Sequence, residues 1–398
     1  MKELWNYIEE NNMKILMIVP TPFFSHRGCH VRIFEEVKFL KKRGHQVKIV
    51  SYHLGETPVG FDIERTLNFF WYKKTESGAS WHKPYLDFFL LLKTFFVAQK
   101  FKPDIFHCHL HEGALIGIIL RPIFNKKIVF DSQEILTKHL IESDFISSGS
   151  LISKIILTIE KFIYKHSPTI IVSNRSNYDI LKDDFKIKAE KLSILPDGID
   201  PEALIVDENY VNNLRRQYNP DNKKIIVYLG TLNKIEGIDD LLRLLKDLKK
   251  IRDDIGVLIL GYPNIEYYRA LAREMGIGES VKFLGRINYN KIYNYLALGH
   301  FAISLKMPTS EGNGKLLNYA ASNLPIICYD HAANRYILDS DALYLNYENS
   351  SVDNARKVDF YLNKGQEELK ILSERLKNKI LDQFSWENLA EKLIKIYS

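Results

Sequence analysis

Residues 310–325 read SEGNGKLLNYAASNLP and lie between two short apolar runs, FAISL at 301–305 and IICY at 326–329. Apolar runs of this length are typical of buried parallel strands. The segment between them predicts a glycine-bearing loop followed by a short helix. The pattern therefore indicates an α/β fold with a parallel sheet, of which this stretch is one crossover.

Lys315 is the residue in this stretch with the clearest chemical meaning. Gly312 and Gly314 allow the backbone to turn sharply, and Lys315 then opens the predicted helix. The unpaired N–H groups of a helix start, its dipole and a lysine together suit a phosphate group. The alternative is that the two glycines only shape a turn and that Lys315 points to water.

Length and composition indicate an ordinary soluble globular protein with two domains. The chain has 398 residues, 46% of them hydrophobic and 26% charged, with a net charge of +6. No basic run is dense enough to indicate nucleic-acid binding. Cys29, Cys108 and Cys328 are scattered singly, which argues against a disulfide scaffold or a structural zinc site.

The expected location is cytoplasmic. The chain begins MKELWNYIEENN, without a visible signal peptide, and no apolar run reaches about 18 residues. Two segments leave peripheral contact at the inner membrane face as an alternative. They are the aromatic-rich residues 61–101 and the basic amphipathic residues 151–166. For the first of them a core helix with snorkelling lysines is the favoured interpretation.

The order of predicted elements indicates two doubly wound halves. The first half opens with a strand at 15–19, a helix near 31–42 and a strand at 47–52, but it lacks a GxGxxG fingerprint. A proline–glycine break, PDGIDP at 196–201, separates it from a second series of strands and helices. We therefore expect domains at 1–197 and 198–384, with a helix at about 385–398 packing back on the first.

The run DIFHCHLHE at 104–112 carries three histidines. Alternation along an extended strand end predicts that His107, His109 and His111 share one face. A metal site is one interpretation. The preferred one is a strand that ends in a cleft, where a histidine hydrogen-bonds a substrate hydroxyl. Carboxylates follow the next strand at 131–134, where they either meet a ligand or cap a helix.

With both halves in view, the chain resembles the retaining glycosyltransferases of the GT-B class, family 4, from Met13 to its C-terminus. The matching pieces are individually short but occur in the family's order: KILMIVP at 14–20, GHQV at 44–47, PDIFHCH at 103–109, LPDGID at 195–200, YLGTL at 228–232, GID at 237–239, FLG at 283–285, KLLNYA at 315–320 and LP at 324–325.

The resemblance implies two Rossmann-like parallel-sheet domains facing across a cleft, and a hexosyltransferase-type enzyme. It would transfer a sugar from a nucleotide sugar to an acceptor hydroxyl of a glycan, glycolipid or small molecule, with retained configuration and without a metal or other cofactor.

The resemblance also implies site residues. Lys315 matches the diphosphate-binding lysine, His109 matches the histidine that contacts the transferred sugar, and Gly28 matches the glycine loop over the donor. The expected site residues are, as catalytic, His109, Lys315 and Glu311; as donor-binding, Gly28, Gly230, Thr231, Lys234, Arg286, Gly312, Asn313, Gly314, Leu316 and Asn318; and on the acceptor side, His107, His111, Glu112 and Glu134.

The chain departs from the family pattern at two places. Asn318 stands where a ribose-binding glutamate is common, and Glu311 is one position out of register with the other glutamate. Thr231 and Glu236 replace an arginine and a lysine. Since a carboxylate repels a diphosphate, we expect Glu236 to point away and Lys234 to supply the charge. These departures favour the alternative of a weak or inactive GT-B partner protein that binds a nucleotide sugar.

Overall fold

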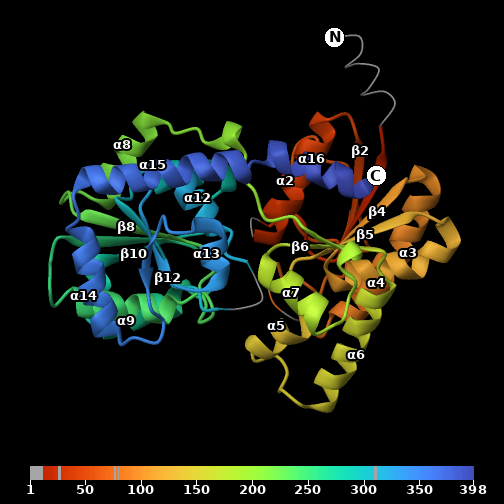
Figure 1. Cartoon of the computed structure of the whole chain (residues 1–398), viewed down its shortest axis with the longest axis horizontal. Coiled ribbons are helices and arrows are strands. Elements are labelled where there is room, and N and C mark those ends of the chain that lie inside the picture. Colours follow the sequence, from red (N-terminus) through yellow and green to blue (C-terminus); the bar gives the residue numbers. More distant parts are fainter. Residues whose placement is uncertain (1–11, 26–27, 76–77, 79, 309–311) are drawn as a thin grey trace, which may run out of the picture. The chain divides into compact units, whose positions relative to one another are not determined.

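The computed structural model describes residues 12–25, 28–75, 78, 80–308 and 312–398 (Figure 1). It contains two compact units, each an α/β unit with its own sheet and core. Of the described residues, the first unit holds those up to Asp197, Gly312 and Trp386–Ser398, and the second unit holds residues 198–308 and Asn313–Ser385. The division falls inside the segment PDGIDP at 196–201.

In the described part of the first unit, seven parallel strands form one sheet in the order β3-β2-β1-β4-β5-β6-β7. The strands are β1 (Lys14–Val19), β2 (Gln46–Ser51), β3 (Ile63–Arg65), β4 (Ile105–His109), β5 (Lys127–Ser132), β6 (Thr169–Val172) and β7 (Leu192–Ile194). The helices are α2 (Gly28–Lys42), α3 (Lys83–Phe101), α4 (Leu110–Phe124), α5 (Leu136–Glu142), α6 (Leu151–His166), α7 (Arg175–Asp183) and α16 (Trp386–Tyr397). No helix among the described residues has the length and apolarity needed to cross a membrane.

Helices cover both faces of this sheet, which explains why its strands are apolar on both sides. Ile15, Met17 and Val19 of β1 pack with α2 and the C-terminal helix α16. Leu16 and Ile18 point the other way, into the core formed with α3, α4 and α6. The helix at the C-terminus therefore belongs to the core of the first unit, on the same face as α2.

The second unit repeats this architecture with the strand order β10-β9-β8-β11-β12-β13, again all parallel. The strands are β8 (Lys224–Leu229), β9 (Ile255–Leu260), β10 (Val281–Gly285), β11 (Phe301–Ser304), β12 (Ile326–Tyr329) and β13 (Leu343–Leu345). The helices are α8 (Glu208–Tyr218), α9 (Ile238–Leu248), α10 (Ile265–Glu274), α11 (Ile292–Leu296), α12 (Lys315–Ala321), α13 (Ala332–Leu338), α14 (Ser351–Leu362) and α15 (Gln366–Gln383).

The predicted crossover near residue 315 is confirmed. β11 and β12 pair in parallel, with Ala302 opposite Ile326 and Ser304 opposite Cys328, and α12 connects them. α12 packs into the core on the α8, α11 and α15 side of the sheet, whereas α9, α10 and α14 cover the other side. Lys315 is the first residue of α12, and it follows β11 after a loop of which residues 309–311 are not described.

Candidate functional site

Lys315 belongs to a cluster of three charged side chains in the second unit. Its ammonium contacts the carboxylate of Glu236, which lies in the loop between β8 and α9. The other oxygen of Glu236, Oε1, is 2.9 Å from Nζ of Lys306, the second residue after β11. The three side chains are only 4–10% exposed. The two cations therefore share one carboxylate at the carboxyl ends of β8 and β11.

The electrostatics of this cluster keep Glu236 ionised. Burial alone would raise the pKa of Glu236, but Lys306 and Lys315 outweigh it and hold this pKa at about 2. The two ammonium groups lie at the carboxyl edge of the second sheet. Lysines in such a place suit an anionic ligand.

The loop after β8 brings its backbone close to Lys315. Gly230 has a φ of 147°, and a Cβ atom on it would lie 2.8 Å from Cε of Lys315. The Nζ of Lys315 is 5.0 Å from the ring centre of Tyr228, whose hydroxyl donates to the carbonyl oxygen of Thr231 at 2.9 Å. Gly230 is thus required for the close approach of Lys315, and Thr231 takes part through its backbone.

Asn313 anchors the loop that precedes α12. Its Nδ2 donates to Oγ of Ser304 at 3.1 Å and to Oδ1 of Asn334 at 2.9 Å. Asn334 in turn donates to the carbonyl oxygen of Tyr329 at 2.8 Å. The Asn313 side chain is buried and connects the loop to the ends of β11 and β12. Its role in this structure is therefore to hold the loop in place.

Two further residues predicted to bind the donor already have partners within the unit. The Leu316 side chain is buried in the core, and its N–H donates to the carbonyl oxygen of Asn313 at 3.1 Å. Oδ1 of Asn318 accepts a hydrogen bond from the hydroxyl of Tyr293 at 3.0 Å. Gly312 and Gly314 lie in the loop before α12, and Glu311 lies outside the described residues.

Glu236 was expected to point away from the diphosphate, but its carboxylate contacts Lys315, the residue expected to bind that diphosphate. The carboxylate is buried between Lys306 and Lys315, because each buried ammonium needs an anionic partner in the absence of water. Lys234 is exposed, in the same loop. Arg286, directly after β10, is also exposed, and its guanidinium lies 5.1 Å from the ring centre of Tyr262.

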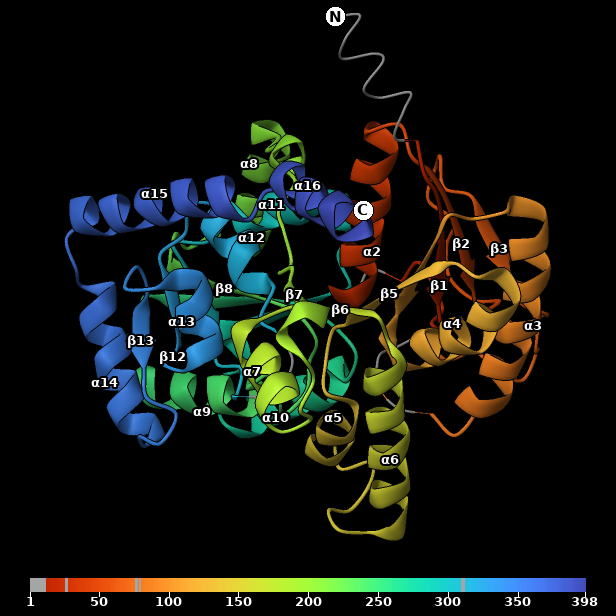
Figure 2. The same cartoon turned by 45° about the vertical axis from the view of Figure 1, so that its right-hand side comes forward.

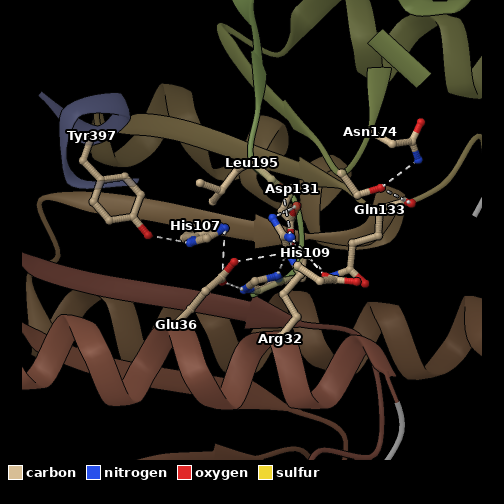
Figure 3. A network of polar contacts seen from close by, with 11 residues as sticks. Arg32, Glu36, His107, His109, Asp131, Gln133, Asn174, Leu195 and Tyr397 are labelled. Atoms are coloured by element: carbon tan, nitrogen blue, oxygen red, sulfur yellow. Dashed lines mark hydrogen bonds and ion pairs between the residues drawn. The ribbon is translucent and has the colours of Figure 1, made fainter. Parts of the chain in front are cut away.

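The first unit contains a second buried polar cluster, centred on Arg32 and Asp131 (Figure 3). Arg32 donates from Nε and Nη2 to the two oxygens of Asp131, at 2.9 and 3.1 Å, and from Nη1 to the carbonyl oxygen of Leu195 at 3.0 Å. Burial alone would raise the pKa of Asp131, but Arg32 and His109 hold this pKa well below its ordinary value. The pair is therefore a bidentate ion pair between α2 and the end of β5.

The histidines of β4 lie against this pair. His107 and His109 stack with ring centres 4.3 Å apart, and both are fully buried. Nδ1 of His109 is 3.1 Å from Oδ2 of Asp131, and Nδ1 of His107 is 2.6 Å from the hydroxyl of Tyr397 in α16 (Figure 3). Burial lowers the pKa of both imidazoles. These rings are neutral parts of the core of the first unit.

Glu36 completes the cluster and raises the question of a metal ion. Ligand atoms of Glu36, His107, His109 and Asp131 lie within 4.8 Å of one another. However, Nε of Arg32 is 3.2 Å from Glu36 and 2.9 Å from Asp131. The guanidinium therefore supplies the positive charge that a metal ion would otherwise bring to these carboxylates. Burial also raises the pKa of Glu36 well above its ordinary value.

Two predictions about the histidines need correction. His111 does not share a face with His107 and His109, because β4 ends at His109 and Leu110 adopts a φ of 58° as α4 begins. Its Nε2 instead lies 2.9 Å from the hydroxyl of Tyr164, on the opposite side of the sheet. His109 does not line an open cleft either, since its side chain is enclosed between β4, β5 and α2.

The remaining acceptor-side residues are half-buried and paired. Glu112 contacts Lys83, next to Asp87, whose pKa is raised to about 7 by burial and by the Glu112 carboxylate. Oε2 of Glu134 is 3.4 Å from Nδ1 of His139.

Gly28, which was predicted to lie over the donor, is the exposed first residue of α2. A Cβ atom on it would meet no heavy atom of the described residues within 4 Å.

Three residues of these clusters were not predicted. Lys306 is the second residue after a buried strand, and a lysine at that position is the signal that could have identified it. Arg32 and Glu36 are spaced i, i+4 on α2, on the same face as Ile33, Val37 and Leu40. Charged residues on an apolar helix face indicate a buried ion pair, but Asp131, the second partner of Arg32, is 99 residues from it in the chain.

Two family models match this chain, and together they cover most of its length. Residues 26–203 match the model described as Glycosyltransferase Family 4, and residues 211–380 match the model described as Glycosyl transferases group 1. The boundary between the two matches lies next to the division between the two units.

Relatives among characterised and curated proteins are distant. An uncharacterized glycosyltransferase of Methanocaldococcus jannaschii is 28% identical over 194 residues, which is 48% of this chain and 47% of that protein. A GDP-mannose-dependent alpha-(1-6)-phosphatidylinositol monomannoside mannosyltransferase of Mycobacterium tuberculosis is 24% identical over 52% of this chain and 55% of its own length. The chain thus spans about half the length of these relatives in the matched segments.

The fold also matches solved structures over nearly the whole chain. The Anabaena protein HepE, in complex with UDP-glucose, superposes with a TM-score of 0.75 at 13% identity, covering 96% of this chain and 99% of that protein. At this identity the likeness concerns the fold of two Rossmann-like parallel-sheet domains.

Proposed function

Because this chain belongs to the family-4 glycosyltransferases of the GT-B fold, we propose that it transfers a sugar from a nucleotide-sugar donor to an acceptor hydroxyl with retained configuration. The observation that carries the proposal is the buried cluster of Lys306, Glu236 and Lys315 at the carboxyl edge of the second sheet. Ligands of open parallel sheets bind at this edge. The HepE complex with UDP-glucose is consistent with a donor of this class.

We assign the donor diphosphate to Lys315. As the bond between sugar and diphosphate breaks, negative charge grows on the leaving oxygen, and a lysine at the start of α12 stabilises it. Lys306 holds Glu236, so that Lys315 can exchange its carboxylate for a phosphate. The two lysines supply the positive charge, and no metal ion is required in this scheme. Gly230, Thr231, Lys234, Arg286 and the 312–314 loop complete the donor side.

The reaction proposed is a same-face displacement. The acceptor oxygen forms a bond to the anomeric carbon while the bond from that carbon to the diphosphate oxygen breaks. The acceptor proton passes to the leaving oxygen, and the products are a glycoside and a nucleoside diphosphate. His109, enclosed beside Asp131, acts in this scheme as a positioning residue for the carboxyl edge of the first sheet.

We propose that the first unit holds the acceptor. Gln133 and Glu134 are half-buried after the end of β5, and Nε2 of Gln133 donates to Oδ2 of Asp131 at 3.0 Å. The mycobacterial relative is named for a lipid-linked acceptor. A glycan or lipid-linked acceptor at a cytoplasmic site is therefore the class to examine first.

Replacement of Lys315 tests the assignment. We expect Lys315→Ala to lower turnover roughly ten- to a hundredfold, as the loss of a charge-assisted contact predicts. Melting curves verify that Lys315→Ala is folded at the assay temperature, and Lys370→Ala, which removes an exposed lysine of the same unit, is the activity control. Nucleotide sugars are first ranked by the rise in melting temperature that they cause. Unchanged turnover in Lys315→Ala would refute the role.

The contact between Glu236 and Lys315 also supports a second candidate, a partner protein that binds a nucleotide sugar without transferring it. In that case Glu236 would stay paired with Lys315, and the lysine would not stabilise a leaving diphosphate. Donor binding without hydrolysis or transfer, over a panel of glycan and lipid acceptors, would favour this candidate. Release of nucleoside diphosphate that depends on an acceptor would favour the transferase.

A further inference from the structure

Three helices of the first unit form one layer over the same face of its sheet. α3 contacts α4, and α4 contacts α6. All three contribute to the core that contains Leu16, Ile18 and Phe106. Figure 2 shows them together along this part of the unit. Their opposite sides form one outer surface, which we call the α3–α4–α6 face.

Large apolar side chains cover the α3–α4–α6 face. On each helix they recur at intervals of about three or four residues, so they form outward stripes in addition to the inward ones. Phe88, Phe96 and Ile155 are more than half exposed. The exposed apolar residues are Phe88, Leu92 and Phe96 of α3, Ile119 and Ile123 of α4, and Leu151, Ile152, Ile155, Ile159 and Phe162 of α6. Apolar surface of this extent marks an interaction site.

The acidic residues of these helices are turned away from that face. Each helix has a single one. Asp87 of α3 accepts a hydrogen bond from the hydroxyl of Tyr52 at 2.5 Å, and Glu112 of α4 contacts Lys83. Glu160 of α6 is fully buried and accepts the N–H of Leu136 at 2.7 Å, at the start of α5.

The exposed charges on the three helices are therefore basic. Lys93 is half-buried and pairs with Glu64 of β3. The other basic residues on the outer sides are Lys100, Arg121, Lys154, Lys161 and Lys165, all of which are exposed. Long basic side chains among exposed apolar ones suit a surface with an apolar interior and a negatively charged boundary.

We propose that the α3–α4–α6 face binds the surface of a membrane that contains anionic lipids. The apolar stripes would enter the boundary between headgroups and acyl chains, and the lysines would meet lipid phosphates. A second copy of the chain fits this face less well, because it would bring like charges together without carboxylates to pair them. The inference stands apart from the transfer reaction, since it concerns only the first unit's outer helices.

Vesicle sedimentation of the full chain, without donor or acceptor, tests the proposal. We expect binding to phosphatidylcholine vesicles that contain phosphatidylglycerol, weaker binding to phosphatidylcholine alone, and loss of binding in high salt. Lys154→Glu/Lys161→Glu/Lys165→Glu should weaken binding by on the order of a hundredfold. Ile155→Ser/Ile159→Ser should weaken it on vesicles of both compositions.

Matched changes in the second unit serve as controls. Lys246→Glu/Lys357→Glu/Lys370→Glu and Phe360→Ser/Ile371→Ser alter equally exposed residues and should leave binding unchanged. Circular dichroism and melting curves verify that each variant is folded. The proposal is overturned if folded wild-type protein does not sediment with anionic vesicles, or if the control variants lose as much binding. A dimer that Ile155→Ser/Ile159→Ser dissociates would instead assign the face to a second copy. Because no substrate is present, these outcomes do not depend on the role of Lys315.

Discussion

The carboxylate of Glu236 contacts the ammonium of Lys315, which lies 79 positions later in the chain. The same carboxylate is 2.9 Å from Lys306. An acidic residue at this position would repel a diphosphate if it stood alone. Between two buried lysines it instead balances part of their charge, and it occupies the place at Lys315 where we propose that a phosphate binds.

Glu236→Gln should destabilise the second unit by about 3–5 kcal/mol, because two buried ammonium groups lose their carboxylate. Inorganic pyrophosphate should then raise the melting temperature of this variant more than that of the wild type, since the anion replaces the missing charge. Thermal melts with and without pyrophosphate measure both effects. Glu266→Gln, at an exposed position of the same unit, is the control. Equal pyrophosphate responses in all three proteins would contradict the prediction.

Gly230→Ala should weaken pyrophosphate binding through Lys315. The new Cβ atom would lie 2.8 Å from Cε of Lys315 and would displace it. Gly276→Ala is a matched control, because Gly276 also has a positive φ but has open space around it. Both variants should lose about 1 kcal/mol or more of unfolding free energy from backbone strain. Calorimetric titration should show weaker binding only in Gly230→Ala, and the same affinity in both would count against the geometry.

Arg32→Met should cost the first unit about 3–5 kcal/mol, because it leaves the buried Asp131 carboxylate without its cation. The double variant Arg32→Met/Asp131→Leu should recover much of that loss, since it removes both members of the buried pair. Urea unfolding measures both. Arg175→Met removes an exposed arginine paired with Asp179, and it should leave the unfolding free energy almost unchanged. A similar small cost for Arg32→Met would show that the buried pair is dispensable.

Tyr397→Phe should lower the unfolding free energy by about 1–3 kcal/mol, because Nδ1 of the buried His107 loses the hydroxyl 2.6 Å away. Amide hydrogen exchange should accelerate in α16, the helix that carries Tyr397. Tyr267→Phe, at an exposed tyrosine of the second unit, provides the comparison. Unaltered exchange in α16 would argue that apolar packing alone holds this helix.

Asp87 should make the stability of the first unit depend on pH. Its pKa is about 7 in the folded chain and near 3.8 when unfolded, so the folded state holds a proton that the unfolded state has lost between these values. Its contribution to stability is therefore complete below about pH 4 and is lost as the pH rises toward 7, by up to about 1.4 kcal/mol per pH unit.

Asp87→Asn should remove that slope, because the amide does not titrate and can still accept the hydrogen bond from Tyr52. Chemical denaturation from pH 4.5 to 8 compares this variant with the wild type and with Asp183→Asn, an exposed position of the same unit. Parallel stability curves for wild type and Asp87→Asn would exclude this role of Asp87.

The two sheets and the place of Lys315 could be predicted because their signals are local. Residues 15–19 are all apolar, and residues 301–305 are apolar except for Ser304, as is typical of strands buried on both faces. The glycines before Lys315 lie in the loop between a strand and a helix, and this loop is only about ten residues long. Such patterns depend only on neighbours in the chain, and they suffice to indicate two parallel α/β units and a lysine at a strand–helix junction.

The partners of the charged residues could not be predicted in this way. Lys315 meets Glu236, and Arg32 meets Asp131, across separations of 79 and 99 residues. His111 turns away from His109 because one residue, Leu110, ends the strand. Desolvation makes every buried charge take a partner, but strand order and helix packing select which partner is within reach. The amino-acid order therefore specifies which chemical groups are present at the sheet edges, and folding in three dimensions specifies which of them are paired.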